Sequence, residues 1–105
     1  MTILYEEEII MGLFDIVGGA IKQANENRME AEREAANWDP IRICKELDRC
    51  RQLTTCMGYS AALTKQCRYI SDYELQEVYD FARRQRNVKA LNTLRPIMED
   101  RGLLY

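Results

Sequence analysis

The chain has 105 residues, of which 47% are hydrophobic and 30% are charged. A chain of this length forms one small domain, and this balance excludes an intrinsically disordered protein. The formal net charge of -2 excludes a polycation that coats nucleic acid with its whole surface.

Charge is distributed unevenly along the chain. Residues 1–40 hold nine acidic and three basic side chains, whereas residues 41–105 hold eight acidic and twelve basic ones. Such asymmetry indicates either an interaction surface or two oppositely charged halves of one fold. We favour the second interpretation, since it needs no partner.

The sequence predicts no membrane span, and its first residues do not resemble a secretory signal. No stretch reaches the roughly 18–20 apolar residues that cross a bilayer, and glutamates occupy positions 6–8, where a signal peptide carries Lys or Arg. We therefore expect a cytoplasmic protein. Because residues 1–10 differ in character from the rest of the chain, we expect Met11 to be the natural start, with residues 1–10 a non-native or disordered extension.

Residues 11–38 are predicted to form a long amphipathic helix that can project from the fold as an arm. Apolar side chains recur at spacings of three and four residues between Leu13 and Ala24. Only Ala31 and Ala35 continue this stripe in the polar second half of the helix.

Two residues near the start of this helix, Phe14 and Ile16, are candidate partner-binding residues. Their side chains are expected to pack on the protein's own core, on a second copy of the chain or in the groove of a partner.

Residues 39–105 are predicted to form the compact helical core. Asp39 can cap a helix that has Pro40 in its first turn. We expect this helix to end at Gly58, because glycine typically ends a helix, and we expect a short third helix to begin at Ser60. One face of the helix that ends at Gly58 carries Ile43, Leu47, Cys50, Leu53, Thr54 and Met57.

Two further helices are predicted after residue 70. Ser71 and Glu74 have the spacing of a capping box, in which each side chain bonds an otherwise unpaired backbone amide. Asn87 offers a turn, Pro96 must bend or restart the last helix, and Gly102 ends it. The residues expected to be buried in the first of these helices are Leu75, Val78, Tyr79 and Ala82. Val88, Leu91 and Leu94 begin the last helix, and Leu103 and Leu104 can pack back. The whole pattern predicts an all-α fold, a small bundle of four to five helices.

The four cysteines lack the spacing of a zinc site. Successive intervals are six, six and eleven residues, whereas zinc-binding pairs are separated by about two to four residues. The chain also has no histidine, so no metal site is predicted. We expect reduced thiols that pack as small apolar groups. If a disulfide forms, Cys50 and Cys67 are the expected pair, because they are equidistant from a turn at Gly58–Tyr59, and Cys56 is the thiol expected to react with a labelling reagent.

Catalytic machinery is not recognisable in the sequence. Without histidine, the commonest general base and the usual partner of a nucleophilic Ser or Cys are missing. The chain contains no Walker-type phosphate loop and no G-x-G-x-x-G, G-x-S-x-G or C-x-x-C motif. We therefore expect a protein that is not an enzyme and needs no cofactor.

A basic cluster lies where the last two helices join. Its members, Arg83, Arg84, Arg86 and Lys89, are candidate partner-binding residues. Two helices joined by a short turn superficially resemble a helix-turn-helix DNA-binding unit, although this turn lacks the common glycine. The interpretation that we favour is that the arginines are solvated or paired with acids such as Glu77, Asp80 and Glu99.

By elimination, the sequence predicts a non-enzymatic protein–protein interaction module, that is, a small adaptor, regulator or inhibitor. The short length and the expected start at Met11 suggest a bacterial source or one in a phage or other mobile element. The alternative is a nucleic-acid-binding regulator that uses the patch from Arg83 to Lys89. Self-association through the N-terminal helix is a third interpretation, and the sequence does not identify a partner protein.

Overall fold

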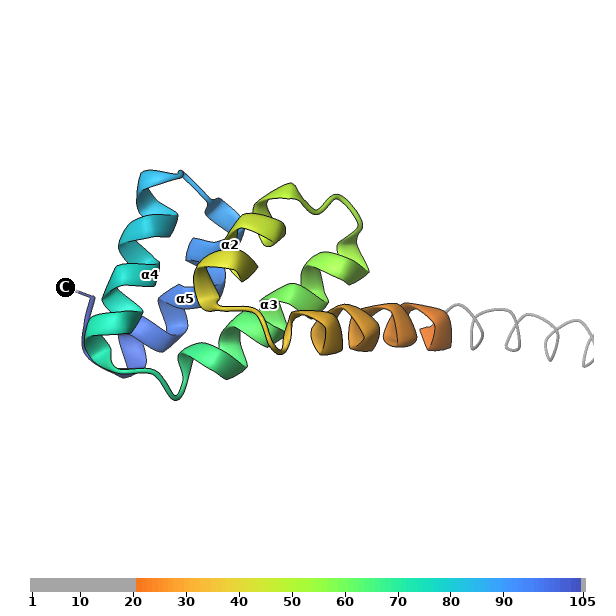
Figure 1. Ribbon diagram of the computed structural model, residues 1–105, viewed down its shortest axis with the longest axis horizontal. Coiled ribbons are helices and arrows are strands. Elements are labelled where there is room, and N and C mark those ends of the chain that lie inside the picture. Colours follow the sequence, from red (N-terminus) through yellow and green to blue (C-terminus); the bar gives the residue numbers. More distant parts are fainter. Residues whose placement is uncertain (1–20, 105) are drawn as a thin grey trace, which may run out of the picture.

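The computed structural model describes residues 21–104, which form helices joined by short turns (Figure 1). A helical segment over residues 21–35 is followed by α2 (Pro40–Arg49), α3 (Leu53–Cys67), α4 (Asp72–Arg84) and α5 (Val88–Asp100). The described residues contain no strand, so the predicted all-α class is confirmed. None of their helices is long and apolar enough to cross a membrane.

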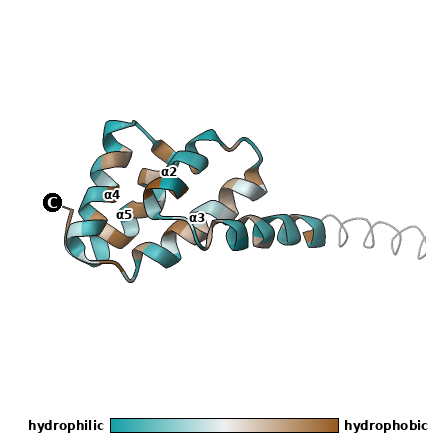
Figure 2. Cartoon of the chain, viewed as in Figure 1, coloured by the Kyte–Doolittle hydropathy of each residue, from teal (hydrophilic) through white to brown (hydrophobic). Residues whose placement is uncertain are grey.

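The predicted helix over residues 11–38 is described only in its second half, where it ends at residue 35. The first half, including Phe14 and Ile16, lies outside the described residues, and so does the predicted extension over residues 1–10. The start of the described segment extends past the other helices (Figure 1), and Figure 2 shows the segment as almost entirely hydrophilic.

The segment over residues 21–35 packs on α3 through small side chains. Ala31 and Ala35 are buried on the segment, and Gly58 and Ala62 are buried on α3. The approach at Gly58 is so close that a Cβ atom there would lie 2.6 Å from the Cβ of Ala31 and 2.9 Å from the backbone nitrogen of Glu32. These small residues therefore allow the two helices to cross with their backbones nearly in contact.

Polar bonds complete this crossing. The side-chain amide of Gln66 on α3 donates to the carbonyl of Ala36 at 3.0 Å and to that of Trp38, where the segment over residues 21–35 has just ended. These carbonyls would otherwise lack partners at a helix C-terminus. Lys65 of α3 forms an ion pair with Glu32.

The predicted boundary between the second and third helices is wrong. The expected helix ended at Gly58, but α2 ends at Arg49, and α3 already begins at Leu53 and runs through Gly58 and Ser60. Gly58 serves the close crossing with Ala31 rather than a helix stop. The prediction of one continuous apolar face from Ile43 to Met57 was also wrong, because the side chains of Leu53 and Met57 are exposed on α3.

The remaining helix ends agree with the sequence signals. Asp39 accepts a bond from the amide of Arg42 at 3.0 Å, and Ser71 accepts one from the amide of Glu74 at 3.1 Å. Gly102 has φ +68 at the end of α5, as the predicted stop requires. The partly buried side chains of Leu103 and Leu104 pack against the core.

The predicted core of α4 is confirmed, since Leu75, Val78, Tyr79 and Ala82 are all buried. Of the apolar residues expected to begin the last helix, Leu94 is buried, Leu91 is partly buried and Val88 is exposed. α5 continues through Pro96 without restarting. Pro96 and Asn92, the residue whose carbonyl loses the amide partner, are both exposed, so water can take the place of the missing bond.

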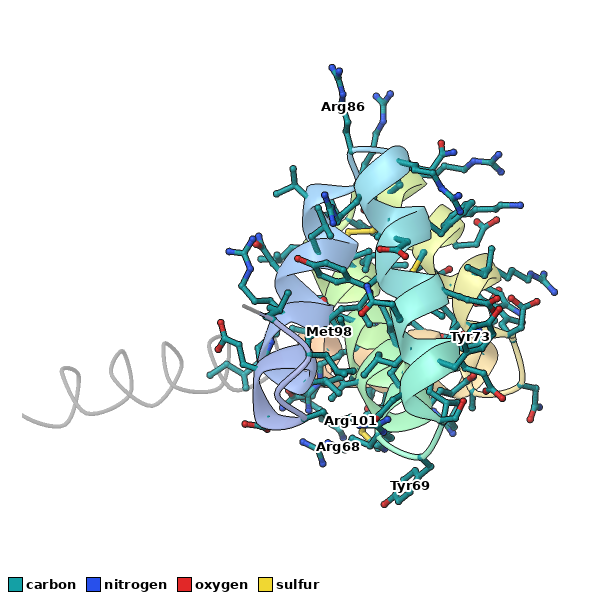
Figure 3. The ribbon with its side chains drawn as sticks, turned by 90° about the vertical axis from the view of Figure 1, so that its left-hand side faces the viewer. Arg68, Tyr69, Tyr73, Arg86, Met98 and Arg101 are labelled. Atoms are coloured by element: carbon teal, nitrogen blue, oxygen red, sulfur yellow. A yellow bond between two sulfur atoms is a disulfide. The ribbon has the colours of Figure 1, made fainter. Side chains whose placement is uncertain are left out.

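Arg101, at the end of α5, holds the connection between α3 and α4. Its guanidinium donates to the carbonyls of Cys67 at 3.0 Å, Arg68 at 2.7 Å and Ile70 at 2.6 Å. It also donates to the carboxylate of Asp72 at 3.1 Å. Figure 3 shows Arg101 beside Arg68 at this end of the domain. A planar guanidinium can satisfy several acceptors at once, so one side chain fixes this turn.

The close crossing predicts that Gly58→Ala destabilises the fold. Helix propensity alone would stabilise α3 by up to about 1 kcal/mol, but the new Cβ meets backbone atoms that cannot move aside. We expect the free energy of unfolding to fall by about 2 kcal/mol, as for other overpacked contacts. Urea unfolding checks this prediction, and a stabilised variant would contradict the described crossing.

Candidate functional site

The four basic residues singled out from the sequence all lie at the α4–α5 junction and are exposed. Arg83 and Arg84 occupy the last turn of α4, Arg86 lies in the turn, and Lys89 is in the first turn of α5. Figure 3 shows Arg86 pointing away from the body of the domain, at the end opposite to Tyr69. Because cations are favourable near a helix C-terminus, Arg83 and Arg84 also contribute to the stability of α4.

The three arginines are solvated rather than paired. Within residues 21–104, the ion pairs are Arg49–Glu46, Lys65–Glu32 and Arg101–Asp72, so Arg83, Arg84 and Arg86 form none. Two of the acids expected as partners have other neighbours. Asp80 accepts a bond from Gln76 at 3.1 Å, and a hydrogen bond to Glu77 raises the pKa of Tyr73.

Lys89 differs from the arginines because its ammonium group is already engaged. It donates to the carbonyl of Cys50 at 2.7 Å and lies 3.9 Å from Sγ of Cys56. Lys89 thus joins the start of α5 to the connection between α2 and α3.

The turn that carries Arg86 has the geometry of a glycine-type helix stop. The amide of Arg86 donates to the carbonyl of Arg83 at 3.1 Å, and the amide of Asn87 donates to that of Ala82 at 2.9 Å. This pair of bonds is a Schellman motif, whose residue after the cap adopts a left-handed conformation. Arg86 occupies that position with φ +52. A residue with a Cβ is strained there by about 1 kcal/mol or more.

The fold brings further cations to the same end, which sequence reasoning missed. Lys45 and Arg49 of α2 line a hollow of about 350 Å³ whose other lining residues are Asp48 of α2, Phe81 of α4, and Gln85 and Asn87 of the α4–α5 turn. Arg51 follows Cys50, the residue bonded by Lys89. We call the exposed cations of this region the basic end: Lys45, Arg49, Arg51, Arg83, Arg84, Arg86 and Lys89.

Exposed apolar side chains adjoin the basic end. Leu53 is 74% exposed, Met57 47% and Val88 64%. Leu53 and Met57 lie one turn apart on α3, and Val88 precedes Lys89, which reaches across to the start of α3. Scattered exposed apolar residues are ordinary, but here Met57 lines the same groove as Lys89, and Val88 is two residues from Arg86.

The expectation of reduced thiols is wrong for Cys50 and Cys56, and so is the alternative pairing of Cys50 with Cys67. The disulfide joins Cys50 and Cys56, with their Cα atoms 5.8 Å apart, and not Cys50 and Cys67. The expected pairing assumed one helix through residue 57. The break at residues 50–52 instead places Cys50 at the end of α2 and Cys56 in the first turns of α3, within reach of each other. Cys56 is therefore not a free thiol in this structure.

The other two cysteines are reduced and fully buried, as expected for small apolar groups. Burial raises the pKa of the Cys44 thiol to about 12, and the nearby Cys67 and Asp39 add to the effect. Burial likewise raises the pKa of the Cys67 thiol to about 12, although the charge of Arg101 opposes it. In the described part of the chain, no three Cys, Asp or Glu side chains are grouped so that they could hold a metal ion.

Comparison of the chain with protein-family models, with curated proteins and with solved structures finds no match. The functional interpretation therefore depends on the chemistry of the surface.

The strained turn predicts that Arg86→Gly stabilises the fold. Glycine adopts the left-handed conformation without a steric penalty, so we expect a gain of about 0.5–1 kcal/mol in the free energy of unfolding. Arg84→Gly is the matched control, since it lies in the helical last turn of α4 and should cost up to about 1 kcal/mol. Urea unfolding of both variants checks the sign, and equal destabilisation would argue against the left-handed turn.

The buried thiols predict a loss of stability at alkaline pH. The folded state keeps its thiol protons up to a pH of about 12, whereas the unfolded thiols ionise near their ordinary value of 9.0. The unfolded state therefore binds fewer protons above pH 9, and each thiol should lower the stability by about 1.4 kcal/mol per pH unit there. Below pH 9 both states keep their thiol protons, so the stabilisation by the two buried thiols is fully present.

The measurement is the free energy of unfolding between pH 7 and pH 10.5. The variant Cys44→Ala with Cys67→Ala is the control, because lysines and tyrosines also titrate in this range. Its stability should fall less steeply above pH 9 than that of the wild type. Parallel curves would show that the two thiols do not contribute.

Proposed function

We propose that the chain is a non-enzymatic interaction module, a small adaptor, regulator or inhibitor, that binds an acidic surface of a partner protein through its basic end. The observation that supports this most directly is the set of exposed arginines, Arg83, Arg84 and Arg86, which lack carboxylate partners among the described residues. A guanidinium can bond a carboxylate through two parallel hydrogen bonds, which gives direction as well as attraction.

The neighbouring apolar side chains favour a protein partner over nucleic acid. Protein interfaces combine arginine and methionine with apolar contact in their buried centre. Met57, Leu53 and Val88 offer such contact beside the basic end. Phosphate groups are bound by cationic and polar groups, so this apolar surface would have no role in contacts to a nucleic-acid backbone.

The identity of the residue in the strained turn also supports a binding role. Glycine at position 86 would relieve the left-handed strain, yet an exposed arginine stands there with φ +52. Strained residues tend to occur where function requires their side chains. We infer that the side chain of Arg86 contributes to binding at a cost to stability.

The alternative, a nucleic-acid-binding regulator, is favoured by one observation. The α4–α5 turn spans three residues and contains a left-handed position, as in the turn of a helix-turn-helix unit, although arginine replaces the common glycine there. Two residues of α5 count against this alternative, because Lys89 is bonded to Cys50 and Thr93 to the hydroxyl of Ser60 at 2.6 Å. A recognition helix needs such side chains free for base edges.

Charge reversal at the end of α4 tests the proposal. The double variant Arg83→Glu with Arg84→Glu should weaken partner binding by at least about tenfold, because like charges then face each other across the interface. Arg95→Glu is the matched control, since Arg95 is an exposed arginine in the middle of α5. Its affinity should stay within about twofold of the wild type.

The measurement starts with capture of partners from nuclease-treated lysate, followed by the dissociation constant of the captured protein for each variant. If the double variant and the Arg95→Glu control lost affinity for the captured protein equally, that result would contradict a role for the basic end. A labelled DNA duplex, titrated at low and physiological salt, tests the alternative. Binding that falls steeply with salt and disappears in the double variant would support a nucleic-acid-binding function instead.

A further inference from the structure

A groove of about 470 Å³ lies between the segment over residues 21–35, α3 and α5. Two cations, Arg28 and Lys89, contribute to its lining, and so do the hydroxyl-bearing residues Ser60 and Thr93. None of the residues that line this groove is acidic. Its volume is that of a small-molecule site, and its charge favours an acidic ligand.

Cys56 lines the same groove, whereas Cys50 faces a different hollow with Glu46, Arg49 and Arg51. The disulfide between them is partly exposed, since both residues are half-buried. Cys56 thus borders a cationic groove that is large enough for a small molecule, and its Sγ lies 3.9 Å from the ammonium of Lys89, another lining residue.

The two sulfur atoms also differ in their electrostatic surroundings. Cys50 is the C-cap of α2, where the helix dipole disfavours an anion. Cys56 is the fourth residue of α3, near a helix N-terminus that favours an anion. The ammonium of Lys89 lies 3.9 Å from Sγ of Cys56. Cys50 has Arg49 and Arg51 in its hollow, but Arg49 is paired there with Glu46. The two helix dipoles and the contact with Lys89 therefore favour a thiolate at Cys56 after reduction.

We propose that Cys56 and its groove form a thiol–disulfide exchange site for an acidic low-molecular-weight disulfide of the glutathione class. In the reduced protein, the Cys56 thiolate attacks one sulfur of the small disulfide RSSR. A Cys56–S–S–R bond forms, the S–S bond of RSSR breaks, and RS⁻ leaves. The Cys50 thiolate then attacks Sγ of Cys56, which forms the observed disulfide and releases a second RS⁻. The two protons of the original thiols pass to the solvent or to the released thiolates.

Lys89 and Arg28 have separate roles in this step. Lys89 stabilises the Cys56 thiolate, which is the nucleophile. Arg28 attracts a carboxylate of the small disulfide. Cys44 and Cys67 take no part, because both thiols are fully buried and their pKa is raised to about 12.

The test compares the reactivity of Cys56 and Cys50, each left without its disulfide partner in the full chain. Cys50→Ser leaves Cys56 as the only accessible thiol, and Cys56→Ser is the matched control that leaves Cys50. Both proteins are reduced, freed of reductant and mixed with glutathione disulfide, and mixed-disulfide formation is followed by intact mass. We expect Cys50→Ser to react about tenfold faster than Cys56→Ser. Equal rates, or a faster reaction of Cys56→Ser, would overturn the proposal.

Two added substitutions separate the roles of the cations. In the Cys50→Ser protein, Lys89→Met should slow the reaction about threefold or more with any disulfide. Arg28→Gln should slow it about threefold with glutathione disulfide and leave the rate with the uncharged bis(2-hydroxyethyl) disulfide unchanged. An equal response to both disulfides would show that the groove does not bind the acidic reagent and would refute that part of the proposal.

A measurement on the wild-type protein tests the same assignment without any substitution that could unfold the chain. The reduced wild-type protein is treated with limiting iodoacetamide and mapped by peptide mass. Cys56 should be alkylated before Cys50, while Cys44 and Cys67 stay unmodified as long as the core is folded. Alkylation of Cys50 first would overturn the assignment of Cys56 as the nucleophile. None of these experiments uses the partner protein, so this inference can fail independently of the proposed function.

Discussion

The arrangement of the α4–α5 junction depends on the carboxamide of Asn87, which bonds two different helices at once. Its Nδ2 donates to the carbonyl of Cys44 on α2 at 2.7 Å, and its Oδ1 accepts from the amide of Ala90 on α5 at 3.1 Å. Among the described residues, Asn87 is the only buried residue whose side chain is an amide or carries a charge. An apolar residue at position 87 would leave the buried amide of Ala90 without a partner and would remove the bond that ties the turn to the carbonyl of Cys44, so the core itself requires the carboxamide.

The layout of the basic end depends largely on that carboxamide. It holds the end of α4 and the start of α5 against α2, so that Lys45 and Arg49 lie beside the turn of Arg86. The backbone amide of Asn87 also closes the left-handed turn by bonding the carbonyl of Ala82. The position from which Arg86 projects is thus determined by a side chain in the core, on the next residue of the chain.

Structural features that depend on residues within one turn of a helix could be predicted from the sequence. The caps at Asp39 and Ser71, the stop at Gly102 and the buried face of α4 depend on residues three or four positions apart, and all were found. The boundary between α2 and α3 could not be predicted in this way. Gly58 resembled a helix stop, but it lies inside α3, where it meets Ala31, and local propensity does not encode a contact between residues 27 positions apart. The spacing Ala31-x-x-x-Ala35 opposite Gly58-x-x-x-Ala62 was the signal that could have indicated a close helix crossing.

For the candidate site, too, the sequence indicated only what depends on neighbouring residues. The sequence cluster Arg83, Arg84 and Arg86 is exposed as expected, because the end of one helix and its turn form a local unit. The engagement of Lys89 with Cys50, and the addition of α2 cations, depend on how separate helices pack. The wrong disulfide partner resulted directly from the misplaced helix boundary, since a helix through residue 57 would keep Cys50 and Cys56 on different sides.

The disulfide from Cys50 to Cys56 encloses only the short connection between α2 and α3. In the chain-entropy description, the stabilisation by a cross-link grows with the logarithm of the loop that it closes, and a loop of this size contributes only about 2 kcal/mol. A bond between distant segments would restrict the unfolded chain far more. The entropy that this bond removes is therefore mostly local, belonging to the few residues between the two helices. Breaking it returns freedom to Arg51 and its neighbours, while the buried contacts of the helices need not change.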